Sequence, residues 1–208
     1  MSGNSLRRYT DISALTSILS ARKITLLDPE TWDDQNDSHY LTQYRDKKNL
    51  QSVLALCFTQ TGETYHHWRV FANGPSGVCI RFDRSILLKA VMKQKDVRMD
   101  EVTYRKLRQL RREKIRISDL PFLKRYPFED EKEFRIIHES NNEKLPNLDI
   151  PIPLSCITRI TLSPWLHRAL SPNLKTMLKL LPDCSHMDIA RSTLISNQEW
   201  RNLSDNAK

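Results

Sequence analysis

Three apolar β-type runs in this sequence carry charged or aromatic residues within them or beside them. They are Arg8-Tyr9-Thr10, the block at 68–83 that ends in Gly77-Val78-Cys79-Ile80-Arg81-Phe82-Asp83, and the stretch at 128–137. A charge on a strand that enters a core is costly unless it is paired or used for function. Three such runs in one small chain predict a polar cleft built on a sheet.

The length and composition allow one domain with a substantial core. The chain has 208 residues, of which 39% are hydrophobic and 28% are charged, as in soluble globular proteins. No apolar run approaches the roughly 20 residues of a membrane helix, and residues 1–8 lack the apolar core of a signal peptide. We therefore expect a cytoplasmic protein without membrane contact, with one domain at 1–197 and a C-terminal tail at 198–208.

Helix and strand patterns are intermixed without the regular alternation of a parallel α/β protein. Apolar spacing predicts helices at 11–21, 64–72, 86–92 and 164–181, and strands at 23–27, 53–58, 78–82, 97–104, 133–136, 157–162 and 189–194. Residues 28–37 and 139–153 are expected to be loops. The chain has four glycines and no Gly-rich phosphate loop, which argues against a Rossmann or P-loop fold. The expected class is α+β, a single domain with a mixed or antiparallel sheet flanked by helices.

Residues 105–116 hold most of the excess positive charge. The whole chain has a formal net charge of +8, and this segment contains seven basic residues and one acid. We expect a basic helical insertion at about 102–118, with Arg105, Arg108, Arg111 and Arg112 as candidate contacts to nucleic acid or to an inhibitory partner protein. The alternative is a solvated helix face without a partner, which is common for charge runs.

Glu133 and Arg135 are two residues apart on an expected strand and so share one face. If Phe134 and Ile136 face a core, the charged pair faces a cleft or solvent. A carboxylate at a rigid strand end suits binding of a sugar hydroxyl or stabilisation of a developing cation. The alternative is a cross-strand ion pair, for example with Arg81, which contributes little when exposed.

Arg8, Tyr9 and Trp68 offer binding groups for a nucleotide. A guanidinium can hold a phosphate and a phenol ring can stack on a flat ring, although an edge strand with a packed Tyr is the plainer interpretation. Trp68 lies beside Arg69 and presents a large aromatic surface, but Trp is also often buried in a core. Both interpretations stay open for these three residues.

Metal and nucleophile motifs are absent from the sequence. The four cysteines are far apart, the six histidines lack ligand spacing, and there is no Gly-x-Ser-x-Gly elbow. We therefore expect no metal cofactor. One alternative with metal remains, a nuclease that uses Mg²⁺ with Asp33, Asp34 and the acids at 129–133.

The order of these motifs resembles the bacterial family known as domain of unknown function 2971. Members begin with a Tyr-Arg-Tyr-like element and a helix, and later carry a Gly-Val-Cys-Ile-x-Phe block and a Tyr-Glu-x-Glu-x-Arg-x-Ile block. The corresponding segments here are 8–10 with the helix at 12–19, then 32–37, 57–59, 68–72, 77–82, 128–137, 157–164 and 189–194. The resemblance covers nearly the whole chain.

The layout of that family is similar to that of the DNA ADP-ribosyltransferase toxins and their relatives. This resemblance implies NAD as substrate, with the nicotinamide against Tyr9 or Trp68, the pyrophosphate on Arg8, and Glu133 stabilising an oxocarbenium-like state. The implied catalytic residues are Glu133, Arg135 and Arg8. The implied residues for NAD binding are Arg8, Tyr9, Thr10, Trp68 and Arg81.

Two functions from different classes follow from the sequence. The first is an intracellular ADP-ribosyltransferase-like or NAD-cleaving effector, as a toxin in a bacterial defence or toxin–antitoxin system. The second is a module without enzymatic activity that binds nucleic acid or protein through residues 105–116. Substitution of Glu133 separates the two, because only the first function needs its carboxylate.

Overall fold

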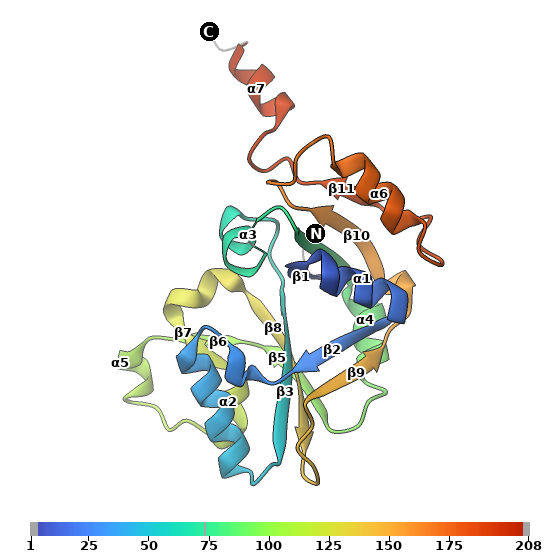
Figure 1. The fold of residues 1–208 in the computed structure, drawn as a ribbon. Helices are drawn as coiled ribbons and strands as arrows, with labels where there is room; N and C mark the ends of the chain where they lie inside the picture. The colour runs from blue at the N-terminus through green and yellow to red at the C-terminus, as the bar shows by residue number, and fades with distance from the viewer. Residues whose placement is uncertain (1–3, 73, 206–208) are drawn as a thin grey trace.

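The computed structural model describes residues 4–72 and 74–205 (Figure 1). Its strands are β1 (Ser5–Asp11), β2 (Lys23–Leu27), β3 (Ser52–Thr59), β4 (Gly77–Asp83), β5 (Val97–Glu101), β6 (Thr103–Arg105), β7 (Leu123–Arg125), β8 (Glu133–Ser140), β9 (Asn147–Pro151), β10 (Ile157–Leu162) and β11 (Ile189–Arg191). Its helices are α1 (Ile12–Ala21), α2 (Gln35–Lys47), α3 (Tyr65–Phe71), α4 (Arg84–Val91), α5 (Leu107–Leu110), α6 (Ser171–Lys179) and α7 (Gln198–Asp205). Short 3-10 turns are η1 (Pro29–Thr31), η2 (Ile117–Phe122), η3 (Tyr126–Glu131) and η4 (Leu154–Cys156).

Nine of the described strands form one branched sheet. The order is β11-β10-β4-β1-β3-β2-β9, with β8 on β3 and β5 on β8. All of these pairs are antiparallel except β10 with β11. The structure therefore confirms the α+β class with a mixed, mainly antiparallel sheet and flanking helices (Figure 1).

The branch point at β3 positions the site. β3 pairs with β8 along its whole length, from Ser52 opposite Ser140 to Thr59 opposite Glu133. It meets β1 at Thr59 and β2 at Ala55. The strands β1 and β2 therefore separate between these two contacts, and the cavity described below lies beside that gap.

The two faces of β8 enter different surroundings. Phe134 and Ile136 join the large core, to which α1 and α4 also contribute, whereas Ile137 joins a smaller core against α2. Because side chains alternate along a strand, Glu133 and Arg135 share the face of Ile137. The predicted common face of Glu133 and Arg135 is thus confirmed, but both side chains are buried, with 5% and 0% exposure.

Two segments expected to be loops contain regular structure. The region at 28–37 includes the start of α2, where the Asp34 side chain accepts hydrogen bonds from the backbone N–H groups of Asn36 and Asp37. The region at 139–153 contains β9, a strand in which only Ile150 is buried. Both elements were missed because α2 is mostly polar and β9 has little apolar alternation, so neither gives a strong periodic signal.

The expected basic helix at about 102–118 is wrong in its extent. The segment begins as β6, α5 is a four-residue turn with no buried residue, and η2 follows at Ile117. Basic side chains a turn apart repel one another, and no apolar face of α5 enters the core to offset this. The expected tail at 198–208 contains α7, which projects from the body (Figure 1), and its residues 206–208 lie outside the described part.

Among the described residues, no helix combines the length with the apolar character that crossing a bilayer requires.

Candidate active site

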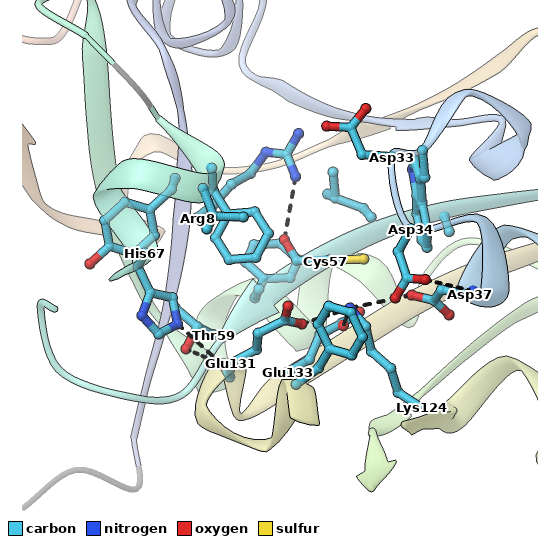
Figure 2. A pocket seen from close by; sticks show the side chains of 18 of the residues that line it. Arg8, Asp33, Asp34, Asp37, Cys57, Thr59, His67, Lys124, Glu131 and Glu133 are labelled. Carbon is cyan, nitrogen blue, oxygen red and sulfur yellow. Dashed lines mark hydrogen bonds and ion pairs between the residues drawn. The ribbon is translucent and has the colours of Figure 1, made fainter. Parts of the chain in front are cut away.

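A cavity of about 620 Å³ opens beside the branch point of the sheet (Figure 2). Its walls come from β1, the end of β2, β3, the start of α2 with the turn before it, α3, β7, η3 and the start of β8. The volume lies within the roughly 300–1,000 Å³ of typical small-molecule sites. The lining residues used below are Arg7, Arg8, Tyr9, Asp37, Cys57, Thr59, His67, Phe71, Lys124, Glu131 and Glu133. The cavity thus brings together Arg8, Tyr9 and Glu133 from distant parts of the sequence.

Arg8 lines the cavity without a carboxylate partner among the described residues. Its Nη1 donates to the backbone carbonyl of Cys57 at 3.3 Å, a bond that leaves the positive charge uncompensated. Burial lowers the pKa of Arg8 from its ordinary value, and the nearby Cys57 and Asp11 oppose this only in part. A half-buried guanidinium without an ion pair is a position that an anionic ligand would stabilise.

An aromatic wall stands next to Arg8. The ring of Tyr9 stacks on His67 at 5.4 Å between centroids, and His67 lies 5.9 Å from Phe71. Burial lowers the pKa of His67, so its imidazole is neutral at pH 7. This wall offers a flat, uncharged surface to a ligand ring.

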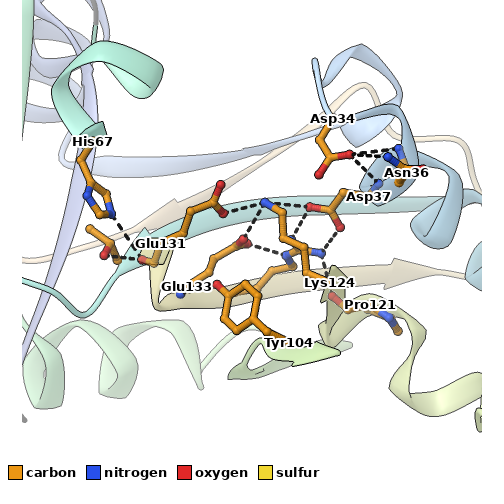
Figure 3. Close-up of polar contacts among 11 residues, drawn as sticks. Asp34, Asn36, Asp37, His67, Tyr104, Pro121, Lys124, Glu131 and Glu133 are labelled. Atoms are coloured by element: carbon orange, nitrogen blue, oxygen red, sulfur yellow. Dashed lines mark hydrogen bonds and ion pairs between the residues drawn. The ribbon is translucent and has the colours of Figure 1, made fainter. Parts of the chain in front are cut away.

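Across the cavity from Arg8 lies a cluster of five charged side chains, of which Figures 2 and 3 label Asp37, Lys124, Glu131 and Glu133. Lys124 Nζ lies 2.7 Å from Glu131, 3.4 Å from Glu133 and 3.5 Å from Asp37. Arg135 Nε donates to Glu133 at 2.7 Å, and its two terminal nitrogens donate to Asp37 at 2.9 and 2.6 Å. Three acids thus share two cations, so the fully ionised cluster has a net charge of −1.

The two glutamates of the cluster differ in pKa. Burial opposes ionisation of Glu133, but the charges of Arg135 and Lys124 outweigh it and lower the pKa of Glu133 to about 2. Burial raises the pKa of Glu131, which only Lys124 counters among its neighbours. Burial also opposes ionisation of Lys124, yet the three carboxylates raise its pKa. Glu133 is therefore a fixed anion at the cavity wall.

Arg135 does not line the cavity. Its side chain is fully buried, and it also donates to the carbonyl of Pro121 at 2.8 Å. With its donors directed to Glu133, Asp37 and Pro121, Arg135 has no path to a ligand in this arrangement. Arg135, which the sequence analysis expects to be catalytic, therefore lies behind Glu133 and not at the cavity wall.

Three residues expected to bind NAD lie outside the cavity lining. Trp68 is fully buried, its Nε1 donates to Glu63 at 2.6 Å, and its ring meets Tyr9 edge-on at 5.1 Å. Arg81 is on β4, where its Nε donates to Thr158 at 3.0 Å. Thr10 follows Tyr9 on β1, opposite Val78. The structure therefore brings together only Arg8 and Tyr9 from the expected NAD-binding set.

Sequence reasoning missed four contributors to the cavity and had little signal for them. Lys124 lies on a three-residue strand, too short for a pattern. Asp37 is on the polar helix α2, and His67 shows no metal or nucleophile spacing. Cys57 lies within an apolar strand, which is typical of a core residue, and burial and then Glu133 raise the pKa of its thiol, yet it lines the cavity.

The basic segment borders the charged cluster. A smaller cavity of about 90 Å³ is lined by Leu107 and Leu110 of α5 together with Asp37 and Lys124. Arg105 lies 3.7 Å from Glu113. The other three candidate contacts are exposed and have no ion-pair partner among the described residues: Arg108, Arg111 and Arg112. Leu107 and Leu110 thus lie beside the charged cluster, and the three arginines without an ion pair belong to the same segment.

Comparisons with known proteins give the following likenesses. The model of the family described as protein of unknown function (DUF2971) matches residues 67–136, which confirms the predicted resemblance for that part of the chain. No curated protein sequence matches. Among solved structures, DarT from Thermus sp. 2.9 in complex with NAD+ is 10% identical, with a TM-score of 0.45 over 91% of this chain and 95% of that chain. DarT in complex with ADP-ribosylated single-stranded DNA is 11% identical, with a TM-score of 0.48 over 91% and 94%.

Proposed function

We propose that this protein cleaves the nicotinamide–ribose bond of NAD and transfers ADP-ribose to an acceptor. The observation that carries the proposal is the opposite charge on the two sides of the cavity. One side presents the unpaired cation of Arg8, and the other presents a buried cluster with one excess negative charge. NAD has the complementary pattern, an anionic diphosphate and a cationic nicotinamide ring. The sequence resemblance to ADP-ribosyltransferases supports the same assignment.

Arg8 and the aromatic wall bind and orient the substrate in this proposal. The guanidinium of Arg8 pairs with the diphosphate, a charge-assisted contact that gains strength in a partly desolvated site. The neighbouring rings of Tyr9 and His67 give the nicotinamide a surface for packing. Trp68 has no part in this contact, because it is buried behind Tyr9.

Glu133 stabilises the transition state. As the glycosidic bond breaks, its electron pair passes to the ring nitrogen, nicotinamide leaves as a neutral molecule, and positive charge develops on the ribose. A fixed carboxylate aimed at that charge lowers the barrier. Arg135 and Lys124 keep Glu133 ionised at every physiological pH. An acceptor nucleophile or water then forms the new bond to the ribose carbon and releases a proton to solvent.

The acceptor in this proposal is a nucleic acid, and the biological setting is that of a toxin in a defence or toxin–antitoxin system. The supporting observation is the exposed basic segment next to the cluster, because Lys and Arg side chains supply most of the affinity for phosphate backbones. An inhibitory partner protein with an acidic surface fits the same segment. A second candidate function, binding of nucleic acid without catalysis, rests on this segment alone.

The test is release of nicotinamide and transfer of label from radiolabelled NAD, with single-stranded DNA, RNA or no acceptor present. We expect release by the native protein and a loss of at least about 100-fold in Glu133→Gln, the scale for removal of a transition-state charge contact. Glu129→Gln is the matched control, because Glu129 is partly exposed and its one ion pair among the described residues is with Lys132, at 3.7 Å. No release with any acceptor contradicts the proposal.

The nucleic-acid candidate has a separate test. Replacement of Arg108, Arg111 and Arg112 by Ala is expected to weaken DNA or RNA binding and to reduce its dependence on salt concentration. Binding that stays salt-independent in the native protein contradicts an electrostatic role of this segment. Native-like binding by Glu133→Gln, together with absent nicotinamide release by the native protein, favours the binding module.

A further inference from the structure

His67 is a buried group with both ring nitrogens in contact with polar atoms. The Thr64 hydroxyl lies 2.5 Å from Nδ1, and Nε2 lies 3.4 Å from the backbone carbonyl of Glu131. The neighbouring His66 is exposed. The two adjacent histidines therefore have different surroundings, and the contacts of His67 reach the chain segment that precedes Glu133.

The hydrogen-bond pattern assigns the tautomer of His67. Thr64 caps α3, and its oxygen accepts from the backbone N–H of His67 at 3.1 Å. Its single hydroxyl hydrogen is then available for Nδ1, which acts as the acceptor. A neutral imidazole with an acceptor at Nδ1 has its proton on Nε2, so Nε2–H donates to the Glu131 carbonyl.

The Glu131 carbonyl is the anchor of the segment at 131–133. It accepts from the Thr59 hydroxyl at 2.6 Å as well as from His67. The next residue, Lys132, has a left-handed backbone with φ 44°, a conformation that non-glycine residues adopt at a cost. Glu131 and Glu133 on either side both point into the charged cluster (Figure 3). A strained turn between two buried carboxylates needs such anchoring to stay in one conformation.

We propose that His67 is a positioning residue that ties the segment at 131–133 to the aromatic wall and thereby fixes the Glu133 carboxylate on the opposite side of the cavity. The Nε2–H holds the Glu131 carbonyl, while the ring packs on Tyr9. The first half of this proposal concerns the conformation of the segment. The second half, an effect on NAD cleavage, rests on the proposed function.

The variants separate the donor from the ring. His67→Phe keeps a ring against Tyr9 but removes Nε2–H. Thr64→Val removes the hydroxyl that sets the tautomer, together with the cap hydrogen bond from the His67 N–H, at a position that is not itself in the cavity lining. Thr64→Ser retains both contacts as the rescue. His66→Gln is the matched control from the adjacent exposed position.

Hydrogen exchange tests the conformational half without any substrate. The Gln60 amide donates to the Lys132 carbonyl at 3.0 Å, and the Lys132 amide donates to the Glu129 carbonyl at 3.1 Å. We expect these two amides to exchange at least about tenfold faster in His67→Phe and Thr64→Val, with α1 amides unchanged and with native rates in Thr64→Ser and His66→Gln. Native exchange at Gln60 and Lys132 in both His67→Phe and Thr64→Val overturns the proposal.

Kinetics test the catalytic half. We expect His67→Phe and Thr64→Val to lower kcat for nicotinamide release about tenfold or more, with KM changed less than about threefold, since bound NAD then meets a misplaced carboxylate. A raised KM with native kcat overturns the positioning role. If the native protein releases no nicotinamide, the proposed function fails, and hydrogen exchange alone decides whether His67 anchors the segment.

Discussion

Arg135→Met probes the charged cluster directly. The substitution keeps much of the side-chain volume but removes four hydrogen bonds, to Glu133, to both oxygens of Asp37 and to Pro121. It leaves three buried acids with Lys124 as their remaining cation. Breaking a buried ion pair by removing one partner costs about 3–5 kcal/mol.

The pKa of Glu133 reports on the same cluster. Burial opposes ionisation, yet the charges of Arg135 and Lys124 together lower the pKa to about 2 from an ordinary 4.5, a net stabilisation of the carboxylate on the order of 3 kcal/mol that Arg135 shares with Lys124. For a chain of this size, a loss of about 3–5 kcal/mol lowers Tm by roughly 6–20 °C, a large share of the roughly 5–15 kcal/mol that stabilises a domain.

Urea unfolding and calorimetry at neutral pH measure this loss, with Arg159→Met as the control. Arg159 pairs with Asp188 at 3.3 Å on the surface, so its loss should cost about 1 kcal/mol or less. A loss in Arg135→Met as small as in the control refutes the reasoning.

The pH dependence adds a second check on the same variant. Because the pKa of Glu133 is depressed on folding, its contribution is complete above pH 4.5 and is lost as the pH falls toward 2. Removal of Arg135 weakens that depression. The difference in stability between native protein and Arg135→Met is therefore expected to shrink across this window, and a constant difference contradicts the assignment.

Three further predictions concern the cavity and the backbone beside it. Arg8→Ala should weaken NAD binding about 10- to 100-fold in calorimetric titration, the range for a hydrogen bond to a charged group; Arg81→Ala, outside the cavity, is the control, and equal effects of the two count against a site at Arg8. Gly77→Ala should lower the free energy of unfolding by about 1–3 kcal/mol, because a Cβ there would meet the Ala72 carbonyl oxygen at 2.1 Å, and native stability would contradict this close approach. Cys57 should react much more slowly than a free thiol with alkylating reagents at pH 8, since burial and then Glu133 raise the pKa of its thiol. Mass spectrometry measures the labelling rate, and a rate equal to that of a free thiol would contradict the raised pKa.

The main elements of the sheet could be predicted from the sequence because their apolar patterns are strong. β3 and β4 are nearly all buried, and β8 alternates between two cores. The side chain of Asp11 caps α1 and accepts a hydrogen bond from the backbone N–H of Ala14 at 2.8 Å. Elements with few buried residues, such as α2 and β9, gave no comparable pattern.

The site was only partly predictable, because some of its charges come from elements without a clear pattern and Asp37 meets Arg135 across a separation of 98 residues. Glu133 was identified from its place on a strand, but its partner Lys124 comes from the short β7 and Asp37 from a polar helix. Sequence spacing alone also cannot tell whether an aromatic side chain lines the cavity or is buried behind a residue that does. Tyr9 and Trp68 are in contact, yet only Tyr9 reaches the cavity.

The central claim is that a cavity with a cation on one side and excess negative charge on the other selects NAD. Titration of the native protein with NAD and with its reduced form tests this directly, since the two share the diphosphate and differ by the positive charge on the nicotinamide ring. We predict that NAD binds at least about tenfold more tightly, a difference of about 1.4 kcal/mol. Equal affinity for the two forms, or no binding of either, contradicts the account.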